Sequence, residues 1–253
     1  MKKLHQLLQI ISISTLLLAP TFLRAQAPAA PAQAPAAPVR IACVGDSITF
    51  GKGTSRGPDE KFNSYPALLQ RMLGREAEVG NFGKNGSTLL NAGGRPYQKL
   101  PMLKAALAFN PGVVVIQLGT NDTLPVNWAH KDQFVADYLE LVRQFQALTP
   151  ATRIFLCLPP WIGIAKSVNF SESALQEQLP LIKKVAEEKG ATVIDVHGAF
   201  LDKKNLLADG LHPNDEGAAV LAKTVYAAIK GKPFTGEIPG PLPASEGAAT
   251  KGQ

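Results

Sequence analysis

Long apolar runs are scarce in this sequence of 253 residues. The main run, residues 10–18, is interrupted by hydroxyl side chains, so it falls short of the about 20 residues that span a bilayer. Because Lys2 and Lys3 precede it and small residues follow it near Ala25, residues 1–25 are interpreted as a secretory signal. A retained membrane anchor is the alternative. We therefore expect a secreted or periplasmic protein, without stable membrane insertion after signal cleavage.

The sequence also lacks a concentrated block of positive charge. Its formal net charge is +6, and removal of the signal, which carries three basic and no acidic residues, would leave +3. The remaining basic residues are scattered, which is typical of a solvated surface rather than of a phosphate-binding stripe. We expect no nucleic-acid partner.

Internal repeats are absent, and the composition divides the chain simply. Residues 26–38 are almost entirely Ala, Pro and Gln, which favours an extended linker that cannot form a core. Residues 231–253 are rich in proline and glycine and predict a loosely ordered tail. The remaining residues, 39–230, are enough for one domain with a substantial core.

Phosphate-binding motifs are missing as well. Five residues separate Gly45 from Gly51, whereas a P-loop has four, and Gly53 stands where a P-loop has its hydroxyl residue. No glycine spacing of the dinucleotide-binding type occurs. The sequence therefore argues against a nucleotide-binding module.

What the sequence does contain is an alternation of short apolar runs and helical patterns. The runs are rich in β-branched or bulky residues and lie at 39–44, 77–82, 113–118, 153–158 and 191–196. Helices are expected around 65–73, 101–109, 134–148, 173–189 and 217–229. Pro180 indicates a late start or a kink in one of them. The alternation predicts a mostly parallel five-stranded sheet covered by helices on both faces, with its functional site at the carboxyl ends of the strands.

Cysteine is rare, and its two copies lie in different apolar runs. Export would permit a disulfide between Cys43 and Cys157. However, the expected fold places a third strand between their strands, which separates the Cα atoms by more than the about 7 Å that a bridge tolerates. We predict two buried free thiols.

Two short motifs, far apart in the chain, supply reactive groups. Ser47 follows the first apolar run and precedes Gly51, so it should lie where a buried strand ends and the backbone turns. A serine hydroxyl needs a neighbouring base to become a nucleophile, and His212 is the best candidate. Asp209, three residues earlier, can accept the Nδ1 proton in a tight turn and fix the tautomer. This chemistry needs neither a metal nor an organic cofactor.

Loops with glycine and asparagine follow the second and third runs, at residues 81–87 and 119–122. Acyl transfer requires donors for the oxygen that becomes negative, and a glycine turn and an amide side chain can provide them. Gly86, Asn121 and the backbone N–H of Ser47 fit this role. The alternative is that these residues only form turns between strands and helices.

The four segments, in this order, resemble the four sequence blocks of the SGNH or GDSL hydrolases. They are Gly45-Asp46-Ser47-Ile48-Thr49, Asn81 to Gly86, Gly119-Thr120-Asn121-Asp122, and Asp209 to His212 followed by Pro213. The resemblance covers nearly all of residues 40–229. It implies a three-layer α/β/α sandwich with a flavodoxin-like sheet.

By the same resemblance, Ser47 is the nucleophile and Asp209 and His212 complete its triad. Gly86 and Asn121 complete the oxyanion hole with Ser47. Gly83 is the other glycine of the second block, but Gly86 matches the oxyanion position better.

Three other polar residues receive different roles. Adjacent side chains on a strand point apart, so Asp46 is expected to brace the turn rather than to act as the triad acid. His197 has no acid three residues before it within a turn, and a structural role is expected. His130 lies in a polar loop and should be exposed.

Three aromatic residues, Trp128, Trp161 and Tyr97, lie in loops near the expected site. Their rings could stack on a sugar, and the alternative is that they pack the loops. Segments 81–97 and 127–128 resemble bacterial members of the sialate O-acetylesterase-like or acetylxylan-esterase-like kind.

The resulting hypothesis is a secreted serine esterase that removes a small acyl group, first of all acetyl, from a small-molecule or polysaccharide ester. The same residues would also serve a lipase, lysophospholipase or thioesterase acting on longer acyl chains. A non-catalytic carbohydrate-binding protein on this fold is the alternative of another class.

Overall fold

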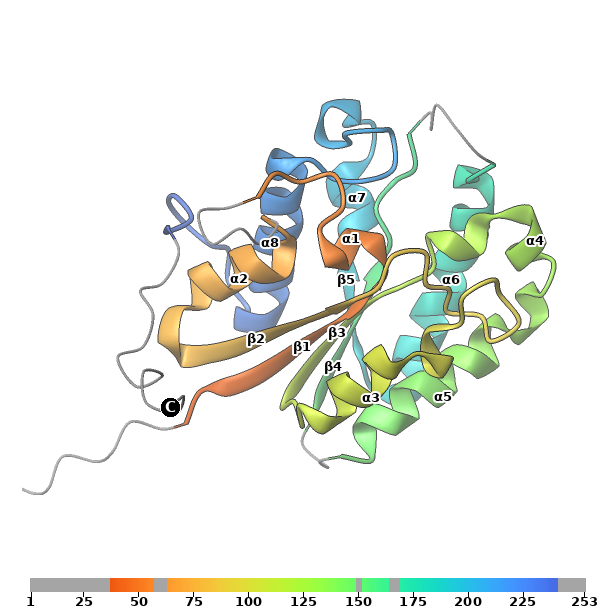
Figure 1. The fold of residues 1–253 in the computed structure, drawn as a ribbon, viewed down its shortest axis with the longest axis horizontal. Coiled ribbons are helices and arrows are strands. Elements are labelled where there is room, and N and C mark those ends of the chain that lie inside the picture. Colours follow the sequence, from red (N-terminus) through yellow and green to blue (C-terminus); the bar gives the residue numbers. More distant parts are fainter. Residues whose placement is uncertain (1–36, 57–62, 149–151, 164–168, 241–253) are drawn as a thin grey trace, which may run out of the picture. The chain divides into compact units, whose positions relative to one another are not determined.

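The computed structural model describes residues 37–56, 63–148, 152–163 and 169–240 (Figure 1). The predicted secretory signal lies outside these ranges, as do most of the predicted linker and the tail beyond residue 240. The chain divides into two units, Met1–Ala36 and Ala37–Gln253, and the described domain belongs to the second.

A five-stranded sheet with the order β2-β1-β3-β4-β5 forms the centre of the domain. All neighbouring strands are parallel, as the alternation of runs and helices predicts. Each strand begins and ends within one residue of a predicted run. The strands are β1 (Val39–Gly45), β2 (Ala77–Gly83), β3 (Val113–Gln117), β4 (Arg153–Leu158) and β5 (Thr192–Asp195).

Five of the helices correspond to the predicted helical patterns: α2 (Tyr65–Leu73), α3 (Pro101–Ala108), α5 (Phe134–Gln146), α6 (Glu172–Lys189) and α8 (Asp215–Lys230). The short helices α1 (Ser47–Phe50), α4 (Pro125–Trp128) and α7 (Val196–Phe200) give no periodic signal in the sequence. Each of them follows a strand or a loop at the carboxyl edge of the sheet (Figure 1).

Helix α6 begins earlier than Pro180 suggests. The Ser171 hydroxyl accepts a hydrogen bond from the Ala174 N–H at 3.1 Å and caps the helix, which then starts at Glu172 and continues through Pro180. A serine at this position satisfies one of the N–H groups that the first turn leaves unpaired. Of the two alternatives for Pro180, a late start or a kink, the late start is therefore wrong.

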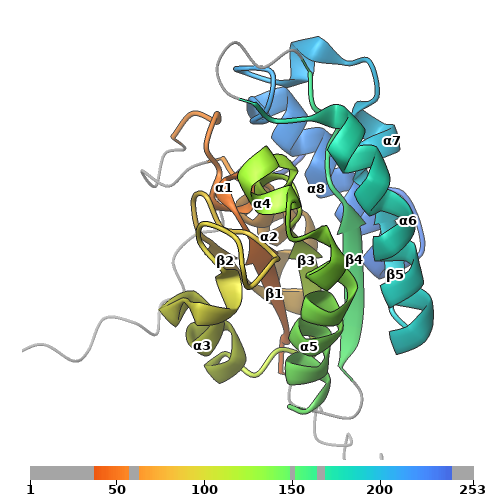
Figure 2. The same cartoon turned by 90° about the vertical axis from the view of Figure 1, so that its right-hand side faces the viewer.

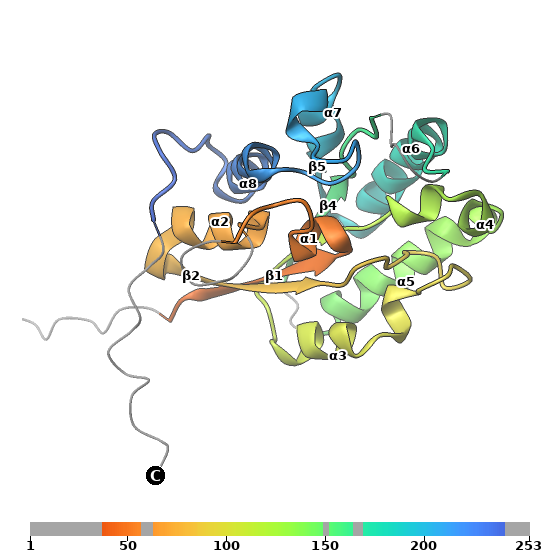
Figure 3. The same cartoon turned by 45° about the horizontal axis from the view of Figure 1, so that its top comes forward.

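Two layers of helices cover the sheet, as the views in Figures 2 and 3 show. Helices α2, α7 and α8 pack on one face with Ile41 and Cys43 of β1, and helices α3, α5 and α6 pack on the other with Ala42 and Val44. Alternate strand residues point to opposite faces, so one apolar run fills both cores. The three-layer α/β/α sandwich is confirmed.

Both cysteines are free and buried, as predicted. Cys43 lies on β1 and Cys157 on β4, and β3 runs between these strands. Burial raises the pKa of the Cys43 thiol to about 12, with a hydrogen bond involving Tyr65 opposing the change. These thiols are therefore unreactive parts of the core.

The first part of the predicted tail packs against the domain. Phe234 and Ile238 contact the core on the side of α8, and the ring of Phe234 lies 5.1 Å from that of Tyr226. Among the residues that the structure describes, no helix is long and apolar enough to cross a membrane.

Candidate active site

Ser47 is the first residue of α1, the short helix that follows β1 (Figure 1). Asp46 caps this helix, because its Oδ1 accepts a hydrogen bond of 2.8 Å from the Ile48 N–H. Gly45 must lack a side chain, since a Cβ there would overlap the Thr49 hydroxyl. The tight turn places the Ser47 hydroxyl at the carboxyl edge of the sheet, where the residue is only 7% exposed.

The turn before α8 brings an imidazole to this hydroxyl. His212 Nε2 lies 2.9 Å from Ser47 Oγ, and its Nδ1 lies 2.7 Å from Asp209 Oδ2. The other Asp209 oxygen accepts hydrogen bonds from the backbone N–H groups of Leu211, at 3.0 Å, and His212, at 2.8 Å. Gly210, with φ of 84°, allows the chain to make this turn. The three residues therefore form one continuous hydrogen-bonded chain.

The surroundings of these three hydrogen-bonded side chains favour a neutral imidazole beside an ionised carboxylate. Burial lowers the pKa of His212, and the Lys52 ammonium lowers it further, against the opposing effect of Asp209. Burial alone would raise the pKa of Asp209, but the hydrogen bonds and charge of His212 outweigh it, so the net shift is downward. A neutral imidazole with its Nδ1 proton held by a carboxylate can accept a proton at Nε2.

The two glycines of the second block differ in their surroundings. The Gly83 N–H donates to Asn81 Oδ1 at 2.9 Å, and a Cβ on Gly83 would overlap the backbone of Phe50. Gly86 has φ of 76° and open space where a Cβ would be. Within the described part of the chain, the backbone N–H groups of Gly86 and Ser47 have no hydrogen-bond partner. Both are thus available to a ligand, whereas the Gly83 N–H is not.

Asn121 connects the loops that carry these groups. Its Nδ2 donates to the Ser87 carbonyl oxygen at 3.0 Å and to Asp46 Oδ2 at 3.2 Å. The backbone carbonyl oxygen of Asn121 accepts a 2.7 Å hydrogen bond from Asn127 Nδ2. Because both amide protons are engaged, a bound oxyanion would have to share one of them, and the longer bond to Asp46 is the one more easily shared.

Asp46 and Asp122 are fully buried acids that hold this arrangement together. Burial raises the pKa of Asp46 to about 7 against its hydrogen bonds, and the nearby Asp122 adds to the increase. Asp122 accepts hydrogen bonds of 2.9 and 2.8 Å from the N–H groups of Leu89 and Leu90. The expected bracing role of Asp46 agrees with these contacts. Sequence reasoning missed Asp122 and Asn127, although both lie in or near the Gly119–Asp122 block.

The structure corrects the expectation for one of the aromatic residues. Tyr97 is completely buried, and its hydroxyl donates to the Phe82 carbonyl oxygen at 2.7 Å, so its ring has no face free for a sugar. Trp128 is also packed: its Nε1 donates to Glu177 at 3.1 Å and its ring meets Phe134 edge to face. Its surroundings favour the packing alternative.

Trp161 and the remaining histidines complete the set of candidates. Trp161 is partly exposed and packs against the core on the side of α8. His197 is buried and hydrogen-bonds to Glu172 at 2.8 Å, in agreement with a structural role. His130 is exposed, as expected.

The two histidines His197 and His212 are each paired with a carboxylate. His212 is engaged by Asp209, and His197 by Glu172. Across the ranges that the structure describes, no group of three or more His, Cys, Asp and Glu side chains could hold a metal ion.

Comparison with known proteins extends these observations. A model of the GDSL-like lipase/acylhydrolase family matches residues 43–220. The chain is 36% identical over 210 residues to an acetylxylan esterase of Xylanibacter ruminicola, which covers 76% of this chain and 43% of that protein. It is 27% identical over 254 residues to a multidomain esterase of Ruminococcus flavefaciens, covering 87% of this chain and 31% of that protein. The chain thus spans less than half the length of these two relatives.

Solved structures share the fold at low identity. A carbohydrate acetylesterase from Sinorhizobium meliloti superposes with a TM-score of 0.61 at 18% identity, covering 76% of this chain and 99% of that one. A lipase/acylhydrolase from Enterococcus faecalis gives a TM-score of 0.59 at 23% identity, covering 78% and 100%. The family model matches more than half of the sequence, and this match, with the 36% identity to the acetylxylan esterase, shows that the chain belongs to the GDSL-like lipase/acylhydrolase family of ester hydrolases.

Proposed function

We propose that this chain is an exported serine esterase that hydrolyses small acyl esters, above all acetyl esters of carbohydrates. The observation that carries the proposal is the chain of hydrogen bonds from Ser47 Oγ through His212 to Asp209, with distances of 2.9 and 2.7 Å. A buried hydroxyl, a neutral imidazole and an ionised carboxylate in this order form the arrangement that activates a serine nucleophile.

The reaction proceeds through an acyl-enzyme. Ser47 Oγ attacks the ester carbonyl while its proton passes to His212 Nε2, and Asp209 stabilises the imidazolium that forms. The carbonyl oxygen becomes negative and accepts hydrogen bonds from the N–H groups of Ser47 and Gly86 and from Asn121 Nδ2. His212 then gives the proton to the leaving alcohol. Water then attacks the acyl-enzyme while His212 takes its proton, and the carboxylic acid is released as His212 returns this proton to Ser47 Oγ.

Support for a carbohydrate acetyl ester comes from the relatives. One is named as an acetylxylan esterase, and a structural neighbour as a carbohydrate acetylesterase. Of the three aromatic residues singled out in the sequence, Trp161 is the one that is partly exposed, near the turn that carries Asp209, and it can stack on a sugar there. The proposal of export rests on the composition of residues 1–25.

The test is a side-by-side screen of acetylated xylan, acetylated sialic acid and long-chain esters with the wild type and Ser47→Ala. Release of acetate from a carbohydrate by the wild type alone is the expected result. Turnover by Ser47→Ala equal to that of the wild type would refute the nucleophile. A preference for long-chain esters would favour a lipase or thioesterase instead. Sugar binding without hydrolysis would favour a carbohydrate-binding protein.

A further inference from the structure

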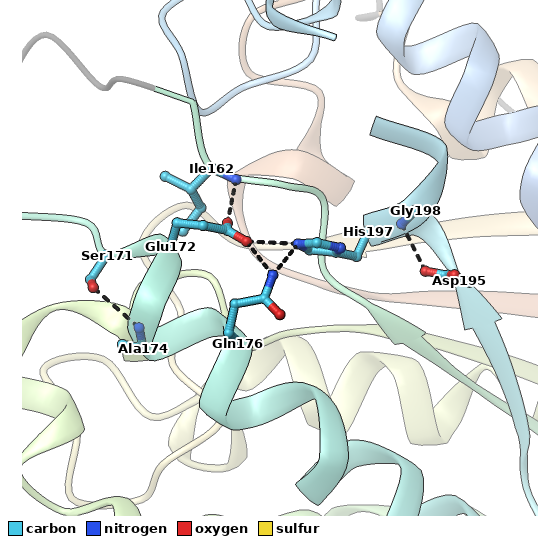
Figure 4. Close-up of polar contacts among 8 residues, drawn as sticks. All are labelled: Ile162, Ser171, Glu172, Ala174, Gln176, Asp195, His197 and Gly198. Atoms are coloured by element: carbon cyan, nitrogen blue, oxygen red, sulfur yellow. Dashed lines mark hydrogen bonds and ion pairs between the residues drawn. The ribbon is translucent and has the colours of Figure 1, made fainter. Parts of the chain in front are cut away.

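A second pair of histidine and carboxylate lies outside the Ser47–His212 site. His197, in the first turn of α7, places its Nε2 at 2.8 Å from Oε1 of Glu172, the first residue of α6. Figure 4 shows Glu172 and Gln176 extending from α6 toward the histidine ring. The His197 side chain is 9% exposed and that of Glu172 is 28% exposed, so the pair is largely shielded from water.

Glu172 accepts more than this one hydrogen bond. Its Oε2 accepts the backbone N–H of Ile162 at 2.9 Å, and its Oε1 also accepts Gln176 Nε2 at 2.6 Å (Figure 4). Burial alone would raise the pKa of Glu172, but the bonds from His197, Ile162 and Gln176 outweigh it, and the net shift is downward. The carboxylate therefore stays ionised and joins α6, α7 and the segment that follows β4.

The segment held in this way touches the turn that carries the triad acid. Ile162 packs with Leu175 and Leu211 in a small apolar cluster of its own. A Cβ on Gly163 would lie 3.3 Å from the Gly210 carbonyl oxygen and 3.4 Å from the Trp161 ring. Gly210 stands between Asp209 and His212 in sequence. Displacement of residues 161–163 would thus reach the Asp209–His212 turn directly.

We propose that Glu172 and His197 are positioning residues, which fix residues 161–163 against Gly210 and thereby hold Asp209 and His212 in their reactive geometry. His197 orients the Glu172 carboxylate, and the carboxylate anchors the Ile162 N–H. Neither residue touches the reacting atoms. The kinetic consequence rests on the function proposed above, but the geometric link does not.

The alternative is that Glu172 only stabilises the first turn of α6. An acidic residue in the first turn of a helix stabilises the helix by interaction with its dipole, and in that case its loss would lower the melting temperature without altering the 161–163 segment. The exposed Glu187 on the same helix is a matched control, because it is the same residue type and its side chain has no hydrogen-bond or ion-pair partner among the described residues.

The geometric test uses tryptophan fluorescence. Trp128→Phe leaves Trp161 as the only tryptophan of the chain, and acrylamide quenching then reports how well the 161–163 segment is held. In this background, Glu172→Ala should increase quenching about twofold or more, since a segment without its anchor opens more often. Glu172→Gln, whose amide oxygen can still accept the Ile162 N–H, should restore most of the protection, and Glu187→Ala should change nothing. Unchanged quenching in Glu172→Ala would overturn the proposal.

The kinetic test uses variants that keep the native Trp128. The number of active sites is first measured by titration with a fluorophosphonate that labels the nucleophile. Per labelled site, Glu172→Ala and His197→Phe should lower kcat on an activated acetate ester about tenfold with little change in KM, since sub-ångström displacements of catalytic groups are costly. His197→Gln, which keeps a donor, should recover part of the loss. A lower melting temperature with unchanged kcat per site would contradict the positioning role and show that the pair only stabilises the fold. If the wild type hydrolysed no ester, the proposed function would fail while the quenching result still decided the geometric link.

Discussion

Replacement of Asn121 by Ala tests how the chain stabilises negative charge during catalysis. The Nδ2 of Asn121 is one of three donors assigned to the oxyanion, and an alanine removes it without adding bulk. Loss of one such donor costs about 2.7–4 kcal/mol of transition-state stabilisation, or about a hundred- to a thousandfold in kcat. Because this bond strengthens only as the carbonyl oxygen becomes negative, KM should change little.

The same substitution also removes two ground-state contacts. Ser87 O and the buried Asp46 carboxyl each lose a donor, at a cost to folding of about 1–3 kcal/mol for each unsatisfied group. Asn127→Ala is the matched control, since it deletes a buried amide from the adjoining helix α4 and leaves the Asn121 Nδ2 in place. It should lower stability comparably but reduce kcat by no more than about tenfold.

The assay is hydrolysis of an activated acetate ester, with rates divided by the number of sites that a fluorophosphonate labels. Circular dichroism and melting curves report the folded fraction of each variant. If Asn121→Ala retained a kcat within twofold of the wild type, Asn121 would be no part of the oxyanion hole. If Asn127→Ala lost as much activity as Asn121→Ala, the effect would belong to loop order rather than to the donor.

Three further predictions concern the histidine. The imidazole must be neutral to act as a base, and burial lowers its pKa, so kcat/KM should rise with pH through a single ionisation below the ordinary value for histidine. Asp209→Asn removes a charge that raises this pKa, so the acid limb should move to lower pH while kcat falls; an unmoved limb would exclude the pairing. Gly53→Ala should reduce kcat at least about fivefold. Gly53 has φ of 97°, and a Cβ there would lie 2.6 Å from the Pro213 carbonyl oxygen and 2.9 Å from His212 Cβ, so His212 would be displaced. Full activity would show that the backbone accommodates the added methyl group without moving His212.

Much of the fold could be predicted because it depends on local patterns. The five strands are short runs of buried apolar residues, and the helix Tyr65–Leu73 begins and ends where its pattern does. The pattern predicts helix α6 to within one residue, but its start depends on the Ser171 side chain rather than on periodicity, and the helix continues through Pro180.

Contacts that join distant segments could not be read from the sequence. Tyr97 lies in a polar stretch that is typical of a surface, yet the loop folds inward, buries its ring and brings its hydroxyl to the Phe82 carbonyl oxygen. Glu172 and His197 are 25 residues apart and belong to no motif. Phe234 lies in a proline- and glycine-rich segment, and only the position of α8 explains why it packs.

The candidate site could be predicted in part from the sequence. The chemistry of Ser47, His212 and Asp209 follows from their residue types, and the DxxH spacing places acid and base in one turn. The approach of His212 to Ser47 across 165 residues follows from no local pattern; the residue chemistry, the predicted parallel sheet and the family resemblance together predict it. The parallel sheet provides the physical reason, since every strand delivers its following loop to the same edge.

The central claim is that Ser47 becomes acylated with His212 as its base. Its most direct test is mass spectrometry of peptides from enzyme quenched during turnover of an activated acetate ester. We expect an acetyl group on the peptide that contains Ser47, with labelling strongly reduced in His212→Ala and absent in Ser47→Ala. An acetyl group on another residue, or equal labelling of the Ser47 peptide without His212, would contradict it.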